Sequence, residues 1–205
     1  MIGIVDYGVG NLFSLSSSLQ SLGQSPVVSG DPDLLRKADR ILLPGVGAFG
    51  DAAEKLRASG LDQLLKQQAK KGVPILGICL GMQMLLEKSY EYGEYPGLGL
   101  IPGAVTPIAE RIPENLKIPH IGWNGLIFPE EKGRSPLFQN LNQGDYVYFV
   151  HSYSAVDCED CVSARTEYGS LLTAAVEKDN VFGCQFHPEK SGPVGLKILS
   201  AFCRL

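Results

Sequence analysis

The segment Pro74-Ile75-Leu76-Gly77-Ile78-Cys79-Leu80-Gly81 decides the fold that the sequence predicts. Its first part is a short apolar run typical of a buried strand, and a helix is predicted over about 80–88. Cys79 falls at the junction, with glycines two positions before and after it. This is the cysteine form of the G-x-S-x-G turn, which holds a nucleophile on a strained strand-to-helix connection. A structural cysteine between packing glycines explains the same residues.

Short apolar strands and helical stretches alternate through the first half of the chain, the order of a parallel sheet flanked by helices. The second half favours antiparallel strands and a final helix. No repeat or long linker divides the 205 residues, so one α/β domain, 1–205, is expected. Predicted strands lie near 2–6, 26–28, 40–43, 74–78, 104–107, 146–151, 161–166, 171–177 and 181–186. Predicted helices lie near 11–22, 48–71 (broken near 59–60), 80–88 and 193–203.

The composition limits the classes of function. A net charge of −4 without a Lys/Arg cluster argues against binding nucleic acid or an anionic membrane. The N-terminus resembles a strand and lacks the features of a signal peptide, and the apolar runs are too short to span a bilayer. A cytoplasmic protein with reduced thiols is therefore expected. Cys158-x-x-Cys161 has metal or redox spacing, but no second pair or nearby histidine accompanies it, and no metal site is predicted.

A second motif, Gln185-Phe186-His187-Pro188-Glu189, closes a late predicted strand. Residues i and i+2 of an extended segment point to the same side, so His187 and Glu189 should face one way. A carboxylate that orients one imidazole nitrogen leaves the other nitrogen for a thiol, which is the arrangement of an activated nucleophile. A surface histidine beside a glutamate is the alternative. The two other histidines, His120 and His151, have no acidic residue two positions away.

The stretch 45–50, Gly-Val-Gly-Ala-Phe-Gly, matches the G-x-G-x-x-G pattern of dinucleotide-binding loops. Such a site needs an acidic residue at the end of the next strand, and that strand ends in Cys79 instead. We therefore expect this loop to lie beside Cys79 at the carboxyl edge of the sheet. Its backbone N–H groups would then join the amide of Leu80 in stabilising an oxyanion. Tight packing alone remains an alternative for these glycines.

Together, Gly77 to Gln83 and His187 to Glu189 resemble the class I glutamine amidotransferases. Stretches along the whole chain resemble one family within that class, the glutaminase subunits of imidazole glycerol phosphate synthase in histidine biosynthesis. They are 6–11, 43–47, 119–124, 148–153 and 187–191. The resemblance implies a three-layer, flavodoxin-like α/β fold with a central, mostly parallel sheet and an additional antiparallel sheet.

The resemblance also implies roles for individual residues. Cys79 would be the nucleophile, His187 the general base and then acid, and Glu189 the group that orients it. The amides of Leu80 and Val46 would form the oxyanion hole. Implied glutamine-binding residues are Gly45, Gly47, Gln83, Glu91, Ser152 and Tyr153. Implied contacts with a partner are made by Trp123, Asn124, Tyr148 and Lys190, although core aromatics and a solvated lysine explain the sequence equally well.

The implied partner is a cyclase subunit, a separate (β/α)8 barrel that would form a heterodimer with this chain. Glutamine hydrolysis through a thioester needs no metal or organic cofactor, and its ammonia would pass to the cyclase. Three alternatives stay open at this point. The chain could serve another class I amidotransferase, such as anthranilate synthase, act as a cysteine peptidase, or be a regulatory subunit without catalysis.

Overall fold

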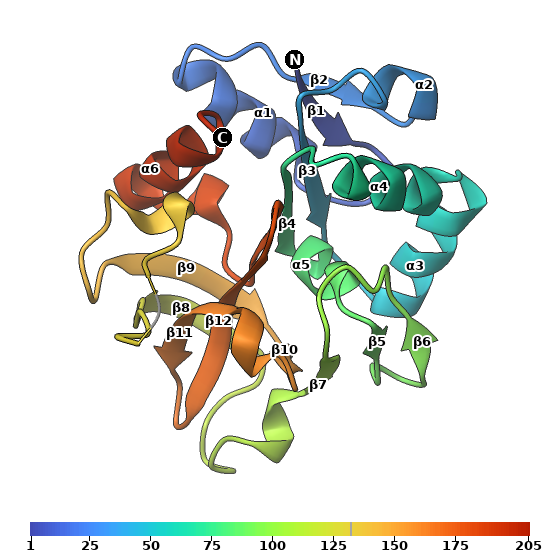
Figure 1. Ribbon diagram of the computed structural model, residues 1–205. Helices are drawn as coiled ribbons and strands as arrows, with labels where there is room; N and C mark the ends of the chain where they lie inside the picture. Colours follow the sequence, from blue (N-terminus) through green and yellow to red (C-terminus); the bar gives the residue numbers. More distant parts are fainter. Residues whose placement is uncertain (132) are drawn as a thin grey trace.

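The computed structural model describes residues 1–131 and 133–205. A seven-stranded sheet crosses the molecule in the order β11-β12-β13-β4-β3-β1-β2 (Figure 1). Its five strands from β13 to β2 pair in parallel, whereas β12 and β11 are antiparallel additions at one edge. The strands are β1 (Ile2–Val5), β2 (Val27–Ser29), β3 (Arg40–Gly45), β4 (Ile75–Cys79), β11 (Val162–Glu167), β12 (Leu171–Lys178) and β13 (Val181–Cys184).

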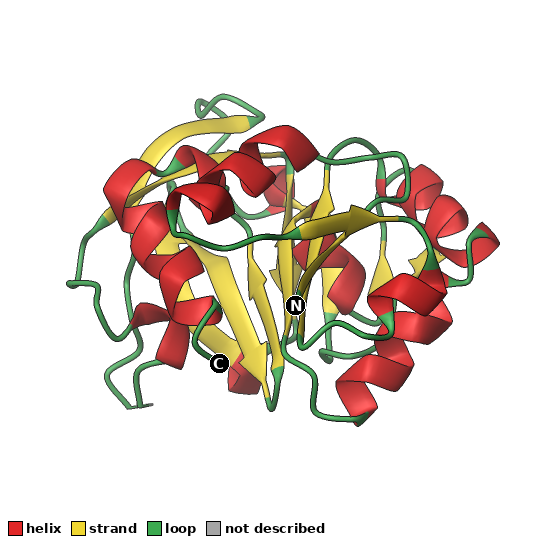
Figure 2. Cartoon of the chain, turned by 90° about the horizontal axis from the view of Figure 1, so that it is seen from above, coloured by secondary structure: helices red, strands yellow, loops and turns green. Residues whose placement is uncertain are grey.

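Helices cover both faces of this sheet, which gives three layers (Figure 2). α1 and α6 contact each other and pack into one apolar core, to which they contribute Leu15, Leu19 and Phe202. α3, α4 and α5 pack into the other core. No helix in the described part of the chain is long and apolar enough to cross a membrane. The helices are α1 (Leu12–Ser21), α2 (Pro32–Leu35), α3 (Phe49–Ala58), α4 (Leu61–Lys70), α5 (Leu80–Leu85) and α6 (Gly192–Phe202).

Two smaller sheets extend the fold, and in Figure 1 β8 and β9 lie to the left of β4 whereas β5 and β6 lie at the lower right. One has the order β10-β7-β5-β6, in which only β5 and β7 pair in parallel, and the other is the antiparallel β8–β9 ribbon. The predicted fold class is therefore confirmed. Their strands are β5 (Lys88–Ser89), β6 (Tyr95–Pro96), β7 (Ala104–Pro107), β8 (His120–Gly125), β9 (Tyr146–His151) and β10 (Tyr153–Val156).

The predicted helix over 80–88 is too long, because α5 ends at Leu85. The carbonyl groups of its last residues accept hydrogen bonds from a loop and not from a further helical turn. The amide of Leu98 donates to Met84 and that of Leu100 to Leu85, so a neighbouring loop supplies the hydrogen bonds that another helical turn would give. The chain then forms β5. The predicted break near 59–60 is confirmed, since Gly60 has φ +72° and separates α3 from α4.

Strands β5, β6, β8 and β10 and helix α2 were not predicted. Residues 120–125 lack the alternation of apolar and polar side chains that marks a strand, and Gly122 has φ +153°. The ribbon forms because β9, which was predicted, offers it a full antiparallel register from His120 opposite His151 to Gly125 opposite Tyr146. α2 is a single turn that begins at an Asp31–Pro32 cap, too short to produce a helical period.

Candidate active site

Cys79 is the last residue of β4 and the N-cap of α5, with φ +55° and ψ −112°. A non-glycine residue rarely adopts this conformation, and such strain concentrates at functional sites. The turn places the thiol where strand β4 meets strand β3, because Gly45 is the register partner of Cys79. Both strands end at the carboxyl edge of the parallel sheet, where ligands bind in open α/β folds.

The two glycines that flank Cys79 are required by close backbone contacts. A Cβ atom added to Gly81 would lie 1.8 Å from the carbonyl oxygen of Leu43, and one added to Gly77 would lie 2.6 Å from the carbonyl oxygen of Gly81. Strand β3, strand β4 and helix α5 therefore meet at a spacing that no other residue allows. The spacing noted in the sequence thus follows from packing around the turn.

We expect Gly81→Ala to destabilise the protein by about 4 kcal/mol or more, because backbone atoms of strand β3 at Leu43 and Pro44 must move to admit the methyl group. Denaturant unfolding followed by circular dichroism measures this loss. Gly133→Ala is the matched control, since Gly133 has open space around its Cβ position and an ordinary φ, and it should change the stability by less than about 0.5 kcal/mol. Equal stability of the two variants would contradict the packing argument.

His187 and Glu189 form a buried pair beside the thiol. Nδ1 of His187 lies 2.8 Å from Oε1 of Glu189, and each side chain is about 3% exposed. The predicted pairing is confirmed, although the predicted strand is not: β13 ends at Cys184, and Pro188–Lys190 forms a 3-10 turn. The hydroxyl of Ser191 donates to the carbonyl of His187 at 2.6 Å and fixes this turn.

The surroundings of His187 favour its protonated form. Burial alone would lower the pKa of His187, but hydrogen bonds to Cys79 and Glu189 and their charges raise it to about 9. Atom Oε2 of Glu189 is buried and has no hydrogen-bond partner among the described residues. The carboxylate therefore directs its interaction at His187 through one oxygen. This geometry suits an imidazole that must keep its Nδ1 proton.

This pKa predicts how stability depends on pH. Because the folded-state pKa is raised from 6.5 to about 9, the interaction is fully present below pH 6.5 and is lost as pH rises through 9. We expect the free energy of unfolding to fall by on the order of 1 kcal/mol per pH unit across this window. In Glu189→Gln the fall should be shallower, because the carboxylate is gone. Urea unfolding at pH 6, 7, 8 and 9 measures both, and parallel curves would refute the assignment.

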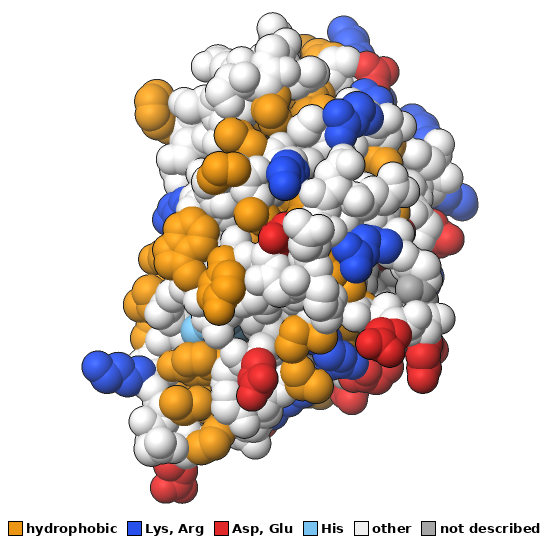
Figure 3. Space-filling view, turned by 90° about the vertical axis from the view of Figure 1, so that its left-hand side faces the viewer, with side chains coloured by type: hydrophobic (Ala, Val, Ile, Leu, Met, Phe, Trp, Pro, Cys, Tyr) orange, Lys and Arg blue, Asp and Glu red, His pale blue; other side chains and the backbone are white. Residues whose placement is uncertain are grey.

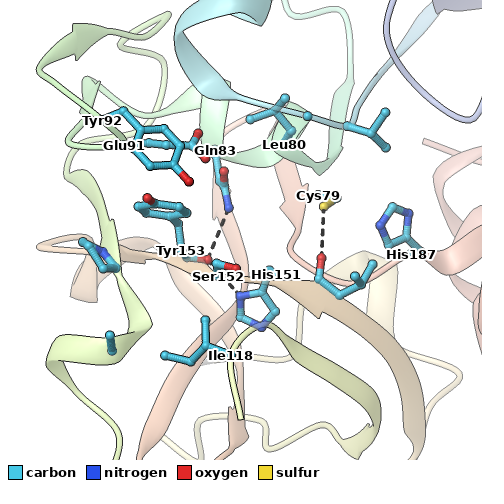
Figure 4. Close-up of a pocket in the computed structure, with 15 residues that line it drawn as sticks. Cys79, Leu80, Gln83, Glu91, Tyr92, Ile118, His151, Ser152, Tyr153 and His187 are labelled. Carbon is cyan, nitrogen blue, oxygen red and sulfur yellow. Dashed lines mark hydrogen bonds between the residues drawn. The ribbon is translucent and has the colours of Figure 1, made fainter.

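A cavity of about 520 Å³ opens beside Cys79. Figure 4 shows Cys79 and His187 at one end, with Tyr92, Glu91 and Tyr153 at the other. The structure brings most of the implied substrate and oxyanion residues to this cavity. Those lining it are Val46, Gly47, Cys79, Leu80, Gln83, Glu91, Ser152, Tyr153 and His187.

Gly45 does not line the cavity. Its Cβ position is filled by the Tyr7 hydroxyl at 2.7 Å and the Gly81 amide nitrogen at 2.9 Å, so tight packing explains this glycine. Gly47 has open space and φ +94°, which lets the loop turn beside Cys79. Tight packing, the alternative given for these glycines, thus explains the first of them, whereas a positive φ explains Gly47.

Gln83 and Glu91 present acceptor oxygens at the far end of the cavity. Nε2 of Gln83 donates to the carbonyl of Tyr153 at 3.3 Å and to Oε1 of Gln185 at 3.0 Å, so both of its amide hydrogens are used. Oε2 of Glu91 accepts from the amide of Phe49 at 2.6 Å and caps α3. Burial raises the pKa of Glu91, and this hydrogen bond opposes the rise.

Sequence reasoning missed three residues of the site. Gln185 is fully buried and bridges Gln83 to Cys79, donating from Nε2 to the sulfur at 3.8 Å. His151 lines the cavity, and Tyr92 stands edge-on to Tyr153 with ring centroids 6.3 Å apart. Gln185 lies two residues before His187, which was the one available signal. His151 and Tyr92 adjoin Ser152 and Glu91 in the sequence, but no motif of their own marked them as site residues.

The four residues implied at a partner interface lie on or next to the β8–β9 ribbon. Trp123 is 51% exposed and meets the half-buried Tyr148 edge-on at 5.9 Å, so Trp123 is not a core aromatic. The ammonium of Lys190 lies over the Tyr148 ring. Oδ1 of Asn124 lies 2.8 Å from Nε2 of His120, and Nδ2 of Asn124 donates to the carbonyl of Glu167.

Cys158 and Cys161 are both buried near the start of β11. Burial raises the pKa of Cys158 to about 11, which disfavours the thiolate that metal binding requires. Across the described residues, no group of three His, Cys, Asp or Glu side chains could hold a metal ion.

The comparison with known proteins agrees with this fold and site. The sequence model of the family Glutamine amidotransferase class-I matches residues 3–204. The structure is similar to that of PurLQS from Thermotoga maritima, with a TM-score of 0.74 over 99% of this chain and 97% of that chain. Their sequences are 24% identical, so that likeness concerns the fold alone. The chain belongs to the class I glutamine amidotransferases.

Full-length relatives define the family more narrowly. The chain is 48% identical over 207 residues to imidazole glycerol phosphate synthase subunit HisH of Wolinella succinogenes, covering 100% of both chains. It is 50% identical over 202 residues to the subunit of the same name from Lactococcus lactis subsp. lactis, covering 98% of this chain and 96% of that one. Within its class, the chain is a member of the HisH family of glutaminase subunits.

Proposed function

We propose that Cys79, His187 and Glu189 carry out the glutaminase reaction, and that the cavity beside them holds the glutamine. The observation that carries this proposal is the strained turn at Cys79 with the buried His187–Glu189 pair next to it. A thiol at a helix N-terminus beside an imidazolium is an arrangement that favours a nucleophilic thiolate. The pKa of about 9 at His187 keeps the imidazole protonated near neutral pH.

The reaction would begin when the sulfur of Cys79 attacks the carboxamide carbon of glutamine. The carbonyl π electrons move to the oxygen, and the amides of Leu80 and Val46, which line the cavity, would stabilise that oxyanion. His187 then donates its proton to the leaving nitrogen as the C–N bond breaks, giving ammonia and a glutamyl thioester. His187, now a base, takes a proton from water, whose oxygen attacks the thioester. Glutamate leaves, and Cys79 regains its thiolate.

The far end of the cavity suits the α-amino and α-carboxylate groups of glutamine. Gln83 has committed both amide hydrogens to the protein, so its oxygen is the group suited to an ammonium donor. Glu91 contributes a carboxylate that can pair with the same charge. We assign the α-amino group to Gln83 and Glu91, and the α-carboxylate to the backbone of Gly47, Ser152 and Tyr153.

The ammonia must reach an acceptor before it is protonated in bulk water, which requires a synthase site on another chain. We infer a heterodimer with a (β/α)8-barrel cyclase that uses the ammonia to make imidazole glycerol phosphate and aminoimidazole carboxamide ribotide. The exposed apolar side chains of the β8–β9 ribbon support a docking surface there: Ile121 is 58%, Trp123 51% and Tyr146 60% exposed. In Figure 3, hydrophobic side chains gather along the left of the face that is shown. Asn124 and Tyr148 belong to this ribbon, and the ammonium of Lys190 lies over the Tyr148 ring.

We further infer that residues 1–205 act as one domain and that the protein works in the cytoplasm. The two large apolar cores share the same central sheet and together draw residues from almost the whole chain. Cys79, Cys158, Cys184 and Cys203 are free thiols, which suits a reducing compartment.

Measuring glutamate released from glutamine, with and without the cyclase and its ligand, tests the function. We expect slow turnover by the isolated chain and a marked increase in the complex. Activation by an anthranilate or guanylate synthase subunit instead of the cyclase would assign a different partner. Absence of glutamate release under every condition would refute the enzymatic proposal, and peptide cleavage lost in Cys79→Ala would indicate a peptidase.

A further inference from the structure

Two histidines outside the proposed triad form a buried pair at the edge of the cavity. His120 on β8 is the register partner of His151 on β9, and Nδ1 of His120 lies 3.0 Å from Nε2 of His151. The two residues are 1% and 6% exposed. His151 lines the cavity, whereas His120 is not one of the lining residues. The proposed mechanism assigns no role to either ring.

Each end of this pair meets an oxygen that can only accept a hydrogen bond. Nδ1 of His151 lies 2.8 Å from the carbonyl oxygen of Tyr153, a contact that Figure 4 marks. Nε2 of His120 lies 2.8 Å from Oδ1 of Asn124. The amide of Asn124 cannot be turned over without loss, because its Nδ2 donates to the carbonyl of Glu167 at 2.9 Å.

This chain of contacts fixes the number of protons that the pair needs. The two oxygens require an N–H at Nδ1 of His151 and at Nε2 of His120, and the contact between the rings requires one more. Three protons on two imidazoles give one positive charge. If both rings are neutral, with one N–H each, every arrangement of the two protons brings two lone pairs face to face in at least one contact of 2.8–3.0 Å.

We propose that His120 and His151 are a positioning pair for the glutamine pocket, which holds one shared extra proton and uses it to fix the carbonyl of Tyr153. The proposal rests on the glutaminase function proposed above. Tyr153 receives a second hydrogen bond from Gln83, so both lone pairs of its carbonyl are engaged. The carbonyl of the preceding Ser152 accepts from Ile108 at 2.9 Å. This backbone, which we assign to the α-carboxylate of glutamine, is thereby held in one conformation.

The packing around His120 supports a charged pair. Its ring lies between two aromatic faces, stacked on Tyr168 at a centroid distance of 4.0 Å and on Phe149 at 5.1 Å, and such faces attract a cation. Burial acts in the other direction and lowers the pKa of His120 and, to about 4, that of His151. His187 is the remaining charged group whose field reaches His151, and it too disfavours charge there. Three short hydrogen bonds and two aromatic faces offset the cost of burying the positive charge. Because the two rings share one proton, only one charge is buried.

Two substitutions of His151 separate its two contacts. Asparagine places an amide N–H near the position of Nδ1, whereas glutamine reaches the position of Nε2. With the wild-type chain and cyclase as the reference, we expect His151→Asn to raise the KM for glutamine about twofold, because it keeps the bond to Tyr153 but loses the contact with His120. His151→Gln should raise the KM about 3- to 10-fold with kcat nearly unchanged, because the bond to Tyr153 is lost. Equal KM values for the two variants would overturn the positioning role, since a cavity-filling role would affect both alike.

Nitrogen NMR of the full chain labelled in its three histidines tests the proton count without any activity. At pH 7 we expect three N–H groups on the two rings and a scalar coupling across the bond between Nδ1 of His120 and Nε2 of His151. Two neutral rings, with one N–H each, would overturn the shared proton. Should the wild-type chain fail to hydrolyse glutamine with the cyclase, the proposed function and the kinetic role fail together, and the spectrum still decides whether the charged pair exists.

Discussion

Replacing Cys79 with alanine is expected to reduce glutamine hydrolysis by roughly 10⁴-fold or more, to the level of the assay background. The cavity holds no other thiol that could form the thioester, because the remaining four cysteines line no part of it. The fold should persist, since alanine keeps the Cβ atom and the turn is enforced by Gly77 and Gly81. Glutamate release by the complex with the cyclase gives the measurement.

The same complex supplies the control for this prediction. When ammonium salt replaces glutamine, the Cys79→Ala complex should form imidazole glycerol phosphate at the wild-type rate, because the acceptor site lies on the partner. Cys203→Ala, at the partly exposed end of α6, should leave both reactions unchanged. Residual glutamine-dependent activity in Cys79→Ala above about 1% would contradict the covalent mechanism, and loss of the ammonium-dependent reaction would indicate a damaged complex instead.

The sequence predicted the main sheet and the Cys79 turn because both depend on short-range patterns. Apolar runs separated by helical periods specify parallel strands. Glycine is required two residues either side of Cys79, because an added Cβ atom would lie 1.8 Å or 2.6 Å from a backbone oxygen. The His187–Glu189 pair was also a local prediction, although its backbone is a 3-10 turn and not the extended strand assumed. His187 itself keeps extended backbone angles as the N-cap of this turn, and its side chain still reaches Glu189.

Long-range contacts account for what the sequence could not predict. Strand β8 lacks strand periodicity and depends on β9 for its register. Gln185 connects Gln83 with Cys79 across more than a hundred residues, and its amide could serve any buried polar group. His120 and His151 have no acidic neighbour two residues away, and their pairing with each other follows only from the ribbon.

Replacing His187 with asparagine is expected to reduce glutamine turnover by roughly 10³-fold or more. Asparagine retains an N–H donor near Nδ1, so the buried carboxylate of Glu189 keeps a hydrogen bond and the turn over Pro188–Lys190 should survive. The variant loses Nε2, which alone can protonate the leaving nitrogen and later activate water. Glutamate release with the cyclase measures the effect, and thermal unfolding establishes that the variant is folded.

His151→Asn provides the matched comparison, because both rings line the same cavity and the substitution is identical. The two positions should respond differently. At His187 the lost nitrogen takes part in both proton transfers, so kcat falls while binding of glutamine is kept. At His151 the retained amide N–H still reaches Tyr153, so turnover stays near the wild-type value. If His151→Asn were the inactive variant and His187→Asn the active one, the general base would be His151, and the proposed triad would be wrong.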